Sequence, residues 1–120
     1  MINQCLAKKM DFPLPLPERV DREVTFAAPK AVAGSAVRKG RVVDAVSVGP
    51  VKDDDWGWYL YFSELIEWTG ARKKSVRLSY YYAPFGSKKW LWGGQYSIEE
   101  SASVIKELLE KTIAKKEWFP

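Results

Sequence analysis

The fold is decided by residues 56–96, which read WGWYLYFSELIEWTGARKKSVRLSYYYAPFGSKKWLWGGQY. Three runs within them, at 56–68, 75–83 and 88–96, are rich in aromatic and β-branched residues, which favour strands. Glycine and proline mark the ends of the first two runs and indicate turns. Because short turns join neighbouring antiparallel strands, the pattern predicts an antiparallel meander.

Upstream of the meander, two more strands are predicted at 20–26 and 41–48, the second ending at Gly49-Pro50. Proline at every second position from 13 to 17 predicts an extended arm over residues 1–19. Residues 27–43 carry four positive charges and no acid. That stretch suits either an arm that follows phosphates or an ordinary solvated loop.

Downstream, one amphipathic helix is predicted over residues 98–116. Ser97 and Glu100 form a capping-box pattern, and the dipeptide Lys115-Lys116 suits the negative end of the helix dipole. The apolar positions expected on one face are Ile98, Ala102, Ile105, Leu109 and Ile113. The apolar end, residues 118–120, is expected to fold back. Residues 20–120 are therefore predicted to form one α+β domain, an antiparallel four- to five-stranded sheet with one C-terminal helix on one face.

The amino-acid composition excludes several classes of function. The 120 residues include no histidine and one cysteine, so histidine-based catalysis, an internal disulfide and a zinc cluster are excluded. The acidic run at 53–55 is expected to form a turn and not a metal site. We predict a protein that is not an enzyme and has no cofactor. Without a signal-peptide pattern or an apolar run of ~20 residues, it is expected to be cytoplasmic.

One helix covers one sheet face, so strand alternation predicts what the other face carries. Beneath the helix we expect Trp58, Leu60 and Phe62 from the first run, and Val76, Leu78 and Tyr80 from the second. On the open face we expect Tyr59, Tyr61 and Ser63, with Arg77, Ser79 and Tyr81. The expected core is Trp58, Leu60, Phe62, Leu78 and one member of the pair Trp90 and Trp92.

Aromatic rings and positive charges are interleaved in this sheet. The net charge is +4, and thirteen of the seventeen aromatic residues lie within residues 56–96. Bases of a single strand stack on such rings for about 1–3 kcal/mol each, and lysine and arginine neutralise phosphates. The composition therefore favours binding of single-stranded nucleic acid. The basic stretch adds Arg38, Lys39 and Arg41 as phosphate contacts.

The segments WGWYLYF and VRLSYYYAPFGSKKWLWGGQYS, with the capped helix after Ser97, resemble the ThermoDBP family of archaeal single-stranded DNA-binding proteins. The order of strands and helix also resembles the Whirly-like transcriptional coactivator fold. Both resemblances imply a concave, aromatic and basic sheet face that holds single-stranded DNA or RNA, in a homodimer or higher oligomer. They imply a strand-binding set of Tyr59, Tyr61, Arg77, Tyr81, Trp90 and Trp92, with Lys73, Lys74, Lys88 and Lys89 on phosphates.

Two other functions were weighed from the same residues. A protein-interaction module would use the exposed aromatic face against another protein, with an affinity that depends weakly on salt. Duplex recognition is disfavoured, because a major-groove reader needs a basic helix face or ribbon. The predicted helix instead exposes Glu99, Glu100, Glu107 and Glu110.

Overall fold

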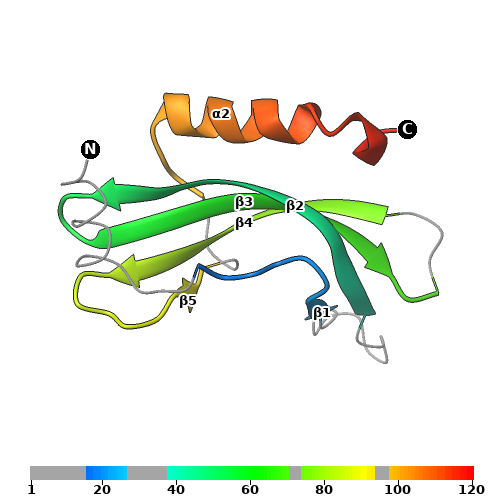
Figure 1. The fold of residues 1–120 in the computed structure, drawn as a ribbon, viewed down its shortest axis with the longest axis horizontal. Coiled ribbons are helices and arrows are strands. Elements are labelled where there is room, and N and C mark those ends of the chain that lie inside the picture. Colours follow the sequence, from blue (N-terminus) through cyan, green and yellow to red (C-terminus); the bar gives the residue numbers. More distant parts are fainter. Residues whose placement is uncertain (1–15, 27–37, 71–73, 94–97) are drawn as a thin grey trace, which may run out of the picture.

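The computed structural model describes residues 16–26, 38–70, 74–93 and 98–120. Within these ranges, five strands, one α-helix and a 3₁₀ turn follow one another (Figure 1). Their bounds are β1 Glu23–Phe26, β2 Arg38–Asp53, β3 Gly57–Trp68, β4 Lys74–Pro84, β5 Leu91–Trp92, α2 Ala102–Ile113 and η1 Lys116–Trp118. The predicted α+β class is confirmed.

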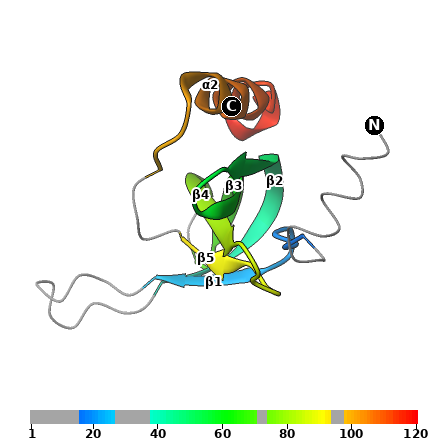
Figure 2. The ribbon, with the colours of Figure 1, turned by 90° about the vertical axis from the view of Figure 1, so that its left-hand side faces the viewer.

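The sheet is an antiparallel meander in the order β1-β2-β3-β4-β5. It is strongly curled, so its two edge strands, β1 and β5, both lie on the side away from α2 (Figure 2). The long strands β2 and β3 form the middle of the sheet, and α2 lies across their convex side. The concave side is therefore left to the N-terminal segment and the edge strands.

β2 is twice as long as predicted, because Gly49-Pro50 does not end it. The strand starts at Arg38, inside the stretch expected to be an arm or loop, and runs to Asp53. Register shifts occur between Val42 and Asp44 and between Val48 and Val51. Gly49 and Pro50 fall in the second shift, where a proline without an N–H removes no ladder hydrogen bond. Bulges of this kind bend a strand and add to the curl.

β5 is shorter than the predicted run at 88–96. In the described part of that run, Leu91 and Trp92 pair with β4. The Gly93 N–H also donates to the Tyr80 carbonyl oxygen, at 3.0 Å. Residues 94–96 lie outside the described residues, so the expected strand is tested only as far as Gly93. Close packing explains one glycine here: a Cβ on Gly93 would lie 2.2 Å from the ring of Tyr80.

The first residue of the helix and the side that it turns toward the sheet both differ from the prediction. It starts at Ala102 instead of Ile98 and ends at Ile113, with Ser101 as the N-cap residue. Ser97, half of the expected capping box, lies outside the described residues. Glu100 accepts hydrogen bonds from the Tyr61 hydroxyl (2.8 Å) and from the Ser101 N–H (2.8 Å).

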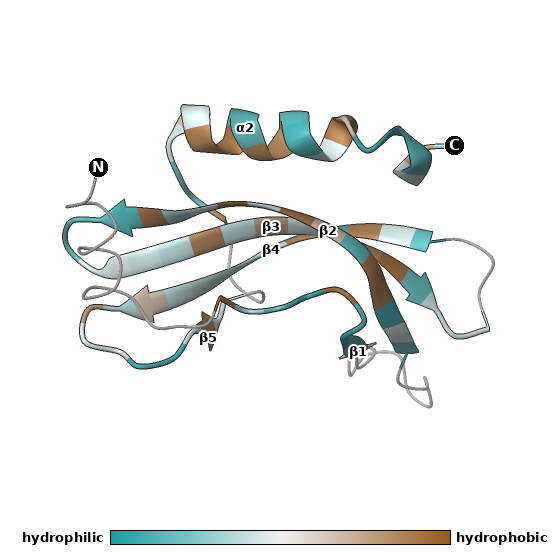
Figure 3. Cartoon of the chain, in the orientation of Figure 1, coloured by the Kyte–Doolittle hydropathy of each residue, from teal (hydrophilic) through white to brown (hydrophobic). Residues whose placement is uncertain are grey.

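The sheet-facing side of α2 differs from the expected apolar stripe by about one residue, or roughly 100° of rotation. Leu108 and Thr112 are buried, whereas Leu109 and Ile113 of the expected stripe are 45% and 67% exposed. The Thr112 and Ser63 hydroxyls lie 2.6 Å apart in a hydrogen bond, which the predicted orientation would break. Polar and apolar segments alternate along the helix (Figure 3).

The predicted alternation holds for β4 and is wrong for β3. Leu108 packs with Tyr61 and Val48 beneath α2, and Tyr59 and Tyr80 join that cluster. The tyrosine side of β3 is thus the covered side, because the register sets Tyr61 opposite Tyr80.

Leu60 and Phe62 pack with Tyr81 on the concave side, against Trp90. Trp58, Leu60 and Phe62 are buried, as expected for core residues. Leu78 is 45% exposed, so its place in the predicted core is wrong.

The C-terminal tail returns to the sheet as expected. Trp118 is buried, and its Nε1 donates to Asp44 Oδ2 at 3.0 Å. Asp53 forms the predicted turn, because its Oδ1 accepts the backbone N–H groups of Asp55 and Trp56. Among the described residues, no helix is long and apolar enough to cross a membrane.

Candidate nucleic-acid interface

The concave side holds a cavity of about 470 Å³, here called the arginine cavity. Its polar and aromatic lining is Arg19, Arg22, Arg77, Ser79, Tyr81, Trp90 and Trp92. Val24 and Thr25 of β1 line it together with Trp92 of β5. The curl of the sheet therefore builds this cavity, since β1 and β5 stand at opposite ends of the strand order.

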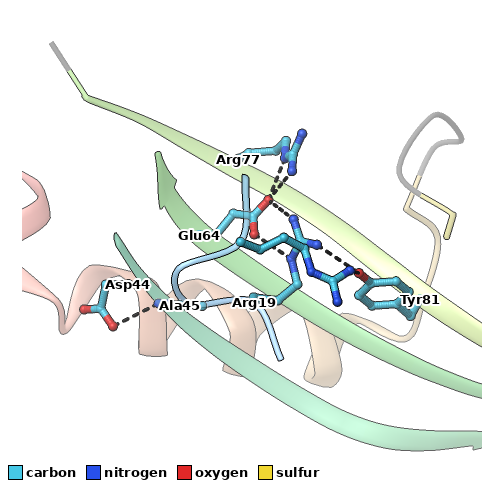
Figure 4. A network of polar contacts seen from close by, with 7 residues as sticks. Arg19, Asp44, Ala45, Glu64, Arg77 and Tyr81 are labelled. Atoms are coloured by element: carbon cyan, nitrogen blue, oxygen red, sulfur yellow. Dashed lines mark hydrogen bonds and ion pairs between the residues drawn. The ribbon is translucent and has the colours of Figure 1, made fainter. Parts of the chain in front are cut away.

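A buried carboxylate organises the arginines (Figure 4). Glu64, fully buried in β3, accepts from Arg19 through Nε (2.8 Å) and Nη2 (3.0 Å), and from Arg77 Nε (2.7 Å). Burial opposes the charge on Arg19, yet the hydrogen bond and charge of Glu64 keep its pKa above the ordinary value. A buried pair of this kind needs both partners.

The hydroxyl of Tyr81 joins the two N-terminal arginines. Its oxygen accepts from Arg19 Nη1 at 2.9 Å and from Arg22 Nη1 at 3.0 Å. Three guanidinium groups stand here against one carboxylate, which leaves two positive charges at the cavity. A local field of this sign attracts anions.

An exposed indole adjoins these charges. Trp92 is 42% exposed, and the guanidinium carbons of Arg19 and Arg77 lie 5.0 and 5.2 Å from its ring centroid. The ring also contacts Tyr81 edge-on, with centroids 5.2 Å apart. The site thus places an aromatic ring on which a base could stack directly beside two positively charged groups.

Four predicted residues meet in the cavity: Arg77, Tyr81, Trp90 and Trp92. Sequence reasoning missed Arg19 and Arg22, which it placed in an extended arm and a short strand. It also missed Glu64, although an acid among the apolar residues of a buried strand signals a buried partner.

Tyr59 and Tyr61 do not belong to this surface. Both lie on the helix side, where Tyr61 is 2% exposed and its ring stacks on Tyr59 with centroids 6.0 Å apart. Burial and the hydrogen bond to Glu100 raise the pKa of Tyr61 well above its usual range. The hollow beside them, about 520 Å³, is also lined by Asp53, Glu99 and Glu100. Its carboxylates would repel a polyanion.

The remaining predicted basic residues are dispersed. Arg38 places its guanidinium over the Trp68 ring, 4.3 Å from the centroid. Lys39 and Arg41 line a separate hollow with Glu23 and Glu67, so acids offset their charge.

The predicted lysines also lie apart from the cavity lining. Lys74 Nζ lies 4.0 Å from a Glu67 carboxylate oxygen. Lys88 and Lys89 are exposed between β4 and β5. Lys73 lies outside the described residues.

Comparisons with protein-family models, with curated proteins and with solved structures found no match. The resemblance to the ThermoDBP and Whirly-like families stays a prediction.

Proposed function

We propose that this protein binds single-stranded nucleic acid, DNA or RNA, with little sequence preference, on the concave face of its sheet. In this proposal a base stacks on Trp92, and neighbouring phosphates meet Arg22 and Arg77. Stacking tolerates any base because every base has a π-face, and phosphate contacts carry no sequence information.

One observation carries the proposal: an exposed indole lies beside two guanidinium groups, in a cavity that bears two surplus positive charges. A duplex hides its base faces and could not use the indole. The opposite side of the sheet offers rings as well, but with carboxylates beside them. Aromatic and basic character coincide on the concave face.

The test is a titration with oligo-dT and with a duplex of equal length, at low and high salt, followed by tryptophan fluorescence. We expect the single strand to bind more tightly and its affinity to fall steeply with salt. Trp92→Ala should weaken binding about 5- to 150-fold, the loss of one stacked base.

Trp56→Ala is the matched control, because Trp56 is 70% exposed but lines the acidic hollow. Its affinity should equal that of the unmodified protein. Equal losses in the two variants, or no binding of oligo-dT at low salt, would contradict the proposal.

A protein-interaction role is the second candidate, favoured by the apolar outer residues Leu109, Ile113 and Phe119, which are 45%, 67% and 51% exposed. It predicts self-association or partner binding that changes little with salt. Sedimentation velocity of the unmodified protein and of Ile113→Lys tests it, and equal monomer fractions in both would argue against self-association through this side.

A further inference from the structure

The arginine cavity offers hydrogen-bond donors whose acceptors are missing from the described part of the chain. Ser79 is 1% exposed and lines the cavity, and its Oγ has no hydrogen-bond partner among the described residues. A buried hydroxyl left without a partner costs about 1–3 kcal/mol. Such a group suggests a place where a ligand atom completes the structure.

Tyr81 adds a second such donor. Its oxygen accepts from both Arg19 and Arg22, which uses both acceptor positions of a phenol and leaves its one hydrogen to donate. Within the described residues no hydrogen bond donated by Tyr81 occurs, whereas Tyr61 on the opposite side donates to Glu100.

The acceptor of this network is already engaged. Glu64 Oε1 receives Arg19 Nη2 and Arg77 Nε, and its Oε2 receives Arg19 Nε. Arg22, which is exposed, makes one side-chain hydrogen bond among the described residues, to the Tyr81 oxygen. A ligand that fits must therefore bring acceptor oxygens and negative charge.

We propose that the arginine cavity binds the terminal phosphate of a nucleotide, either at the phosphorylated end of a single strand or on a free mononucleotide. A phosphate monoester carries close to two negative charges near pH 7 and three acceptor oxygens, which matches two surplus positive charges and two hydroxyl donors. A phosphodiester within a strand carries one charge. The base stacks on Trp92, a part that rests on the proposed function.

The dimensions of the cavity agree with this ligand. Its volume of about 470 Å³ lies within the range of roughly 300–1,000 Å³ that is usual for small-molecule sites. Trp90 and Trp92 line the cavity together with the three arginines. A single nucleotide unit, and not a continuous duplex, suits this arrangement of rings and donors.

The experiment compares two oligo-dT strands of one length, with and without a 5′-phosphate, by fluorescence anisotropy. The unmodified protein should bind the phosphorylated strand at least about tenfold more tightly, the effect of one hydrogen bond to a charged group. Ser79→Ala should reduce this preference and leave the affinity for the unphosphorylated strand nearly unchanged. Tyr81→Phe also removes the oxygen that accepts from Arg19 and Arg22, so it should reduce the preference and the affinity for both strands. Arg22→Gln changes an exposed residue outside the core. It should reduce the affinities for the phosphorylated and the unphosphorylated strand.

Competition with thymidine monophosphate, thymidine and inorganic phosphate distinguishes the two sources of the phosphate. Displacement by the monophosphate but not by thymidine supports a mononucleotide site. Displacement by none of the three, together with a tenfold preference for the phosphorylated strand, supports a strand-end site.

Equal binding of the two strands by the unmodified protein would overturn the terminal-phosphate site and leave the proposed function standing. Binding of the monophosphate without any binding of oligo-dT would overturn the proposed function and leave the terminal-phosphate site standing. Binding of neither would overturn both. Thermal unfolding of Ser79→Ala, which removes only a hydroxyl, checks that a lost preference does not come from a lost fold.

Discussion

Among single residues, Glu64 stabilises the concave face through its buried ion pair. It is the one carboxylate that is fully buried among the described residues, and it binds Arg19, which is 7% exposed. Glu64→Gln would remove the charge that compensates a buried guanidinium. We expect the variant to lose about 3–5 kcal/mol of unfolding free energy, as usual when one partner of a buried pair is removed. Urea unfolding followed by circular dichroism measures this loss.

Lys74→Gln is the matched control, since Lys74 and Glu67 are each half exposed and 4.0 Å apart. Exposed pairs contribute about 0–1 kcal/mol. If Glu64→Gln cost no more than Lys74→Gln, the buried network would not stabilise the fold.

The sequence predicts the face on which a residue lies where local pattern determines its position. Arg77 and Tyr81 were placed correctly because two-residue alternation within β4 is independent of its neighbours. Tyr61 was placed on the wrong face, because hydrophobicity was used to choose the covered side of β3. Its ring is buried through Leu108 and Glu100, contacts that need the position of the helix. Arg19 was missed because its partner lies 45 residues away in the chain.

The orientation of α2 makes a prediction at the scale of elements. Leu108 is 1% exposed against Tyr61 and Val48, whereas its neighbour Leu109 is 45% exposed. Leu108→Ala should lower the unfolding free energy by about 2–5 kcal/mol, the usual range for a buried leucine. Leu109→Ala removes the same atoms from the outer side and should cost less than about 1 kcal/mol. Chemical denaturation of both variants measures the difference, and the reverse order would restore the orientation predicted from the sequence.

The C-terminal tail depends on the charge of Asp44. Burial tends to raise the pKa of this carboxyl, but hydrogen bonds from Trp118 and Lys115 outweigh it and hold the pKa below its ordinary value of 3.8. The folded state thus favours the ionised form. The resulting stability is present above the unfolded pKa and is lost as the pH falls through the folded one.

We therefore expect Asp44→Asn to be less stable than the unmodified protein at pH 7, with a difference that shrinks as the pH falls below about 4. Denaturant unfolding from pH 7 down to pH 3 measures that difference. Glu117→Gln, at an exposed acid of the same tail, should show almost no difference at any pH. A gap between Asp44→Asn and the unmodified protein that stays constant with pH would contradict the role of the charge.

The ends of a strand could be predicted where turn residues mark them in the sequence. They could not be predicted where pairing with a neighbouring strand sets them. β3 was expected at 56–68 and is found at Gly57–Trp68, ending before Gly70. Gly57 itself has a φ of 152°, and a Cβ there would lie 2.1 Å from the Ala83 oxygen. β2 runs past its predicted end because the long partner strand β3 supplies hydrogen bonds on both sides of the Gly49-Pro50 irregularity. Local propensity contains no information about such a partner.

At the scale of the whole molecule, the two sides of the sheet carry opposite local charge beside aromatic rings. Arg19, Arg22 and Arg77 surround the concave cavity, whereas Asp53, Glu99 and Glu100 line the hollow on the helix side. The modest overall charge of +4 conceals this division. A polyanion should therefore bind on the concave side. Its affinity should depend more on where the positive charges lie than on the net charge of the molecule.

Removing one charge from each side tests that division. Arg22→Gln on the concave side and Lys106→Gln on the outer side of α2 both change the net charge by one, and both residues are exposed. For single-stranded oligo-dT, the slope of log affinity against log salt should fall by about 0.7 in Arg22→Gln, the value for one phosphate contact on a single strand. It should stay unchanged in Lys106→Gln. An equal fall in both variants would mean that net charge alone attracts the strand, and the concave face would then have no special part in binding.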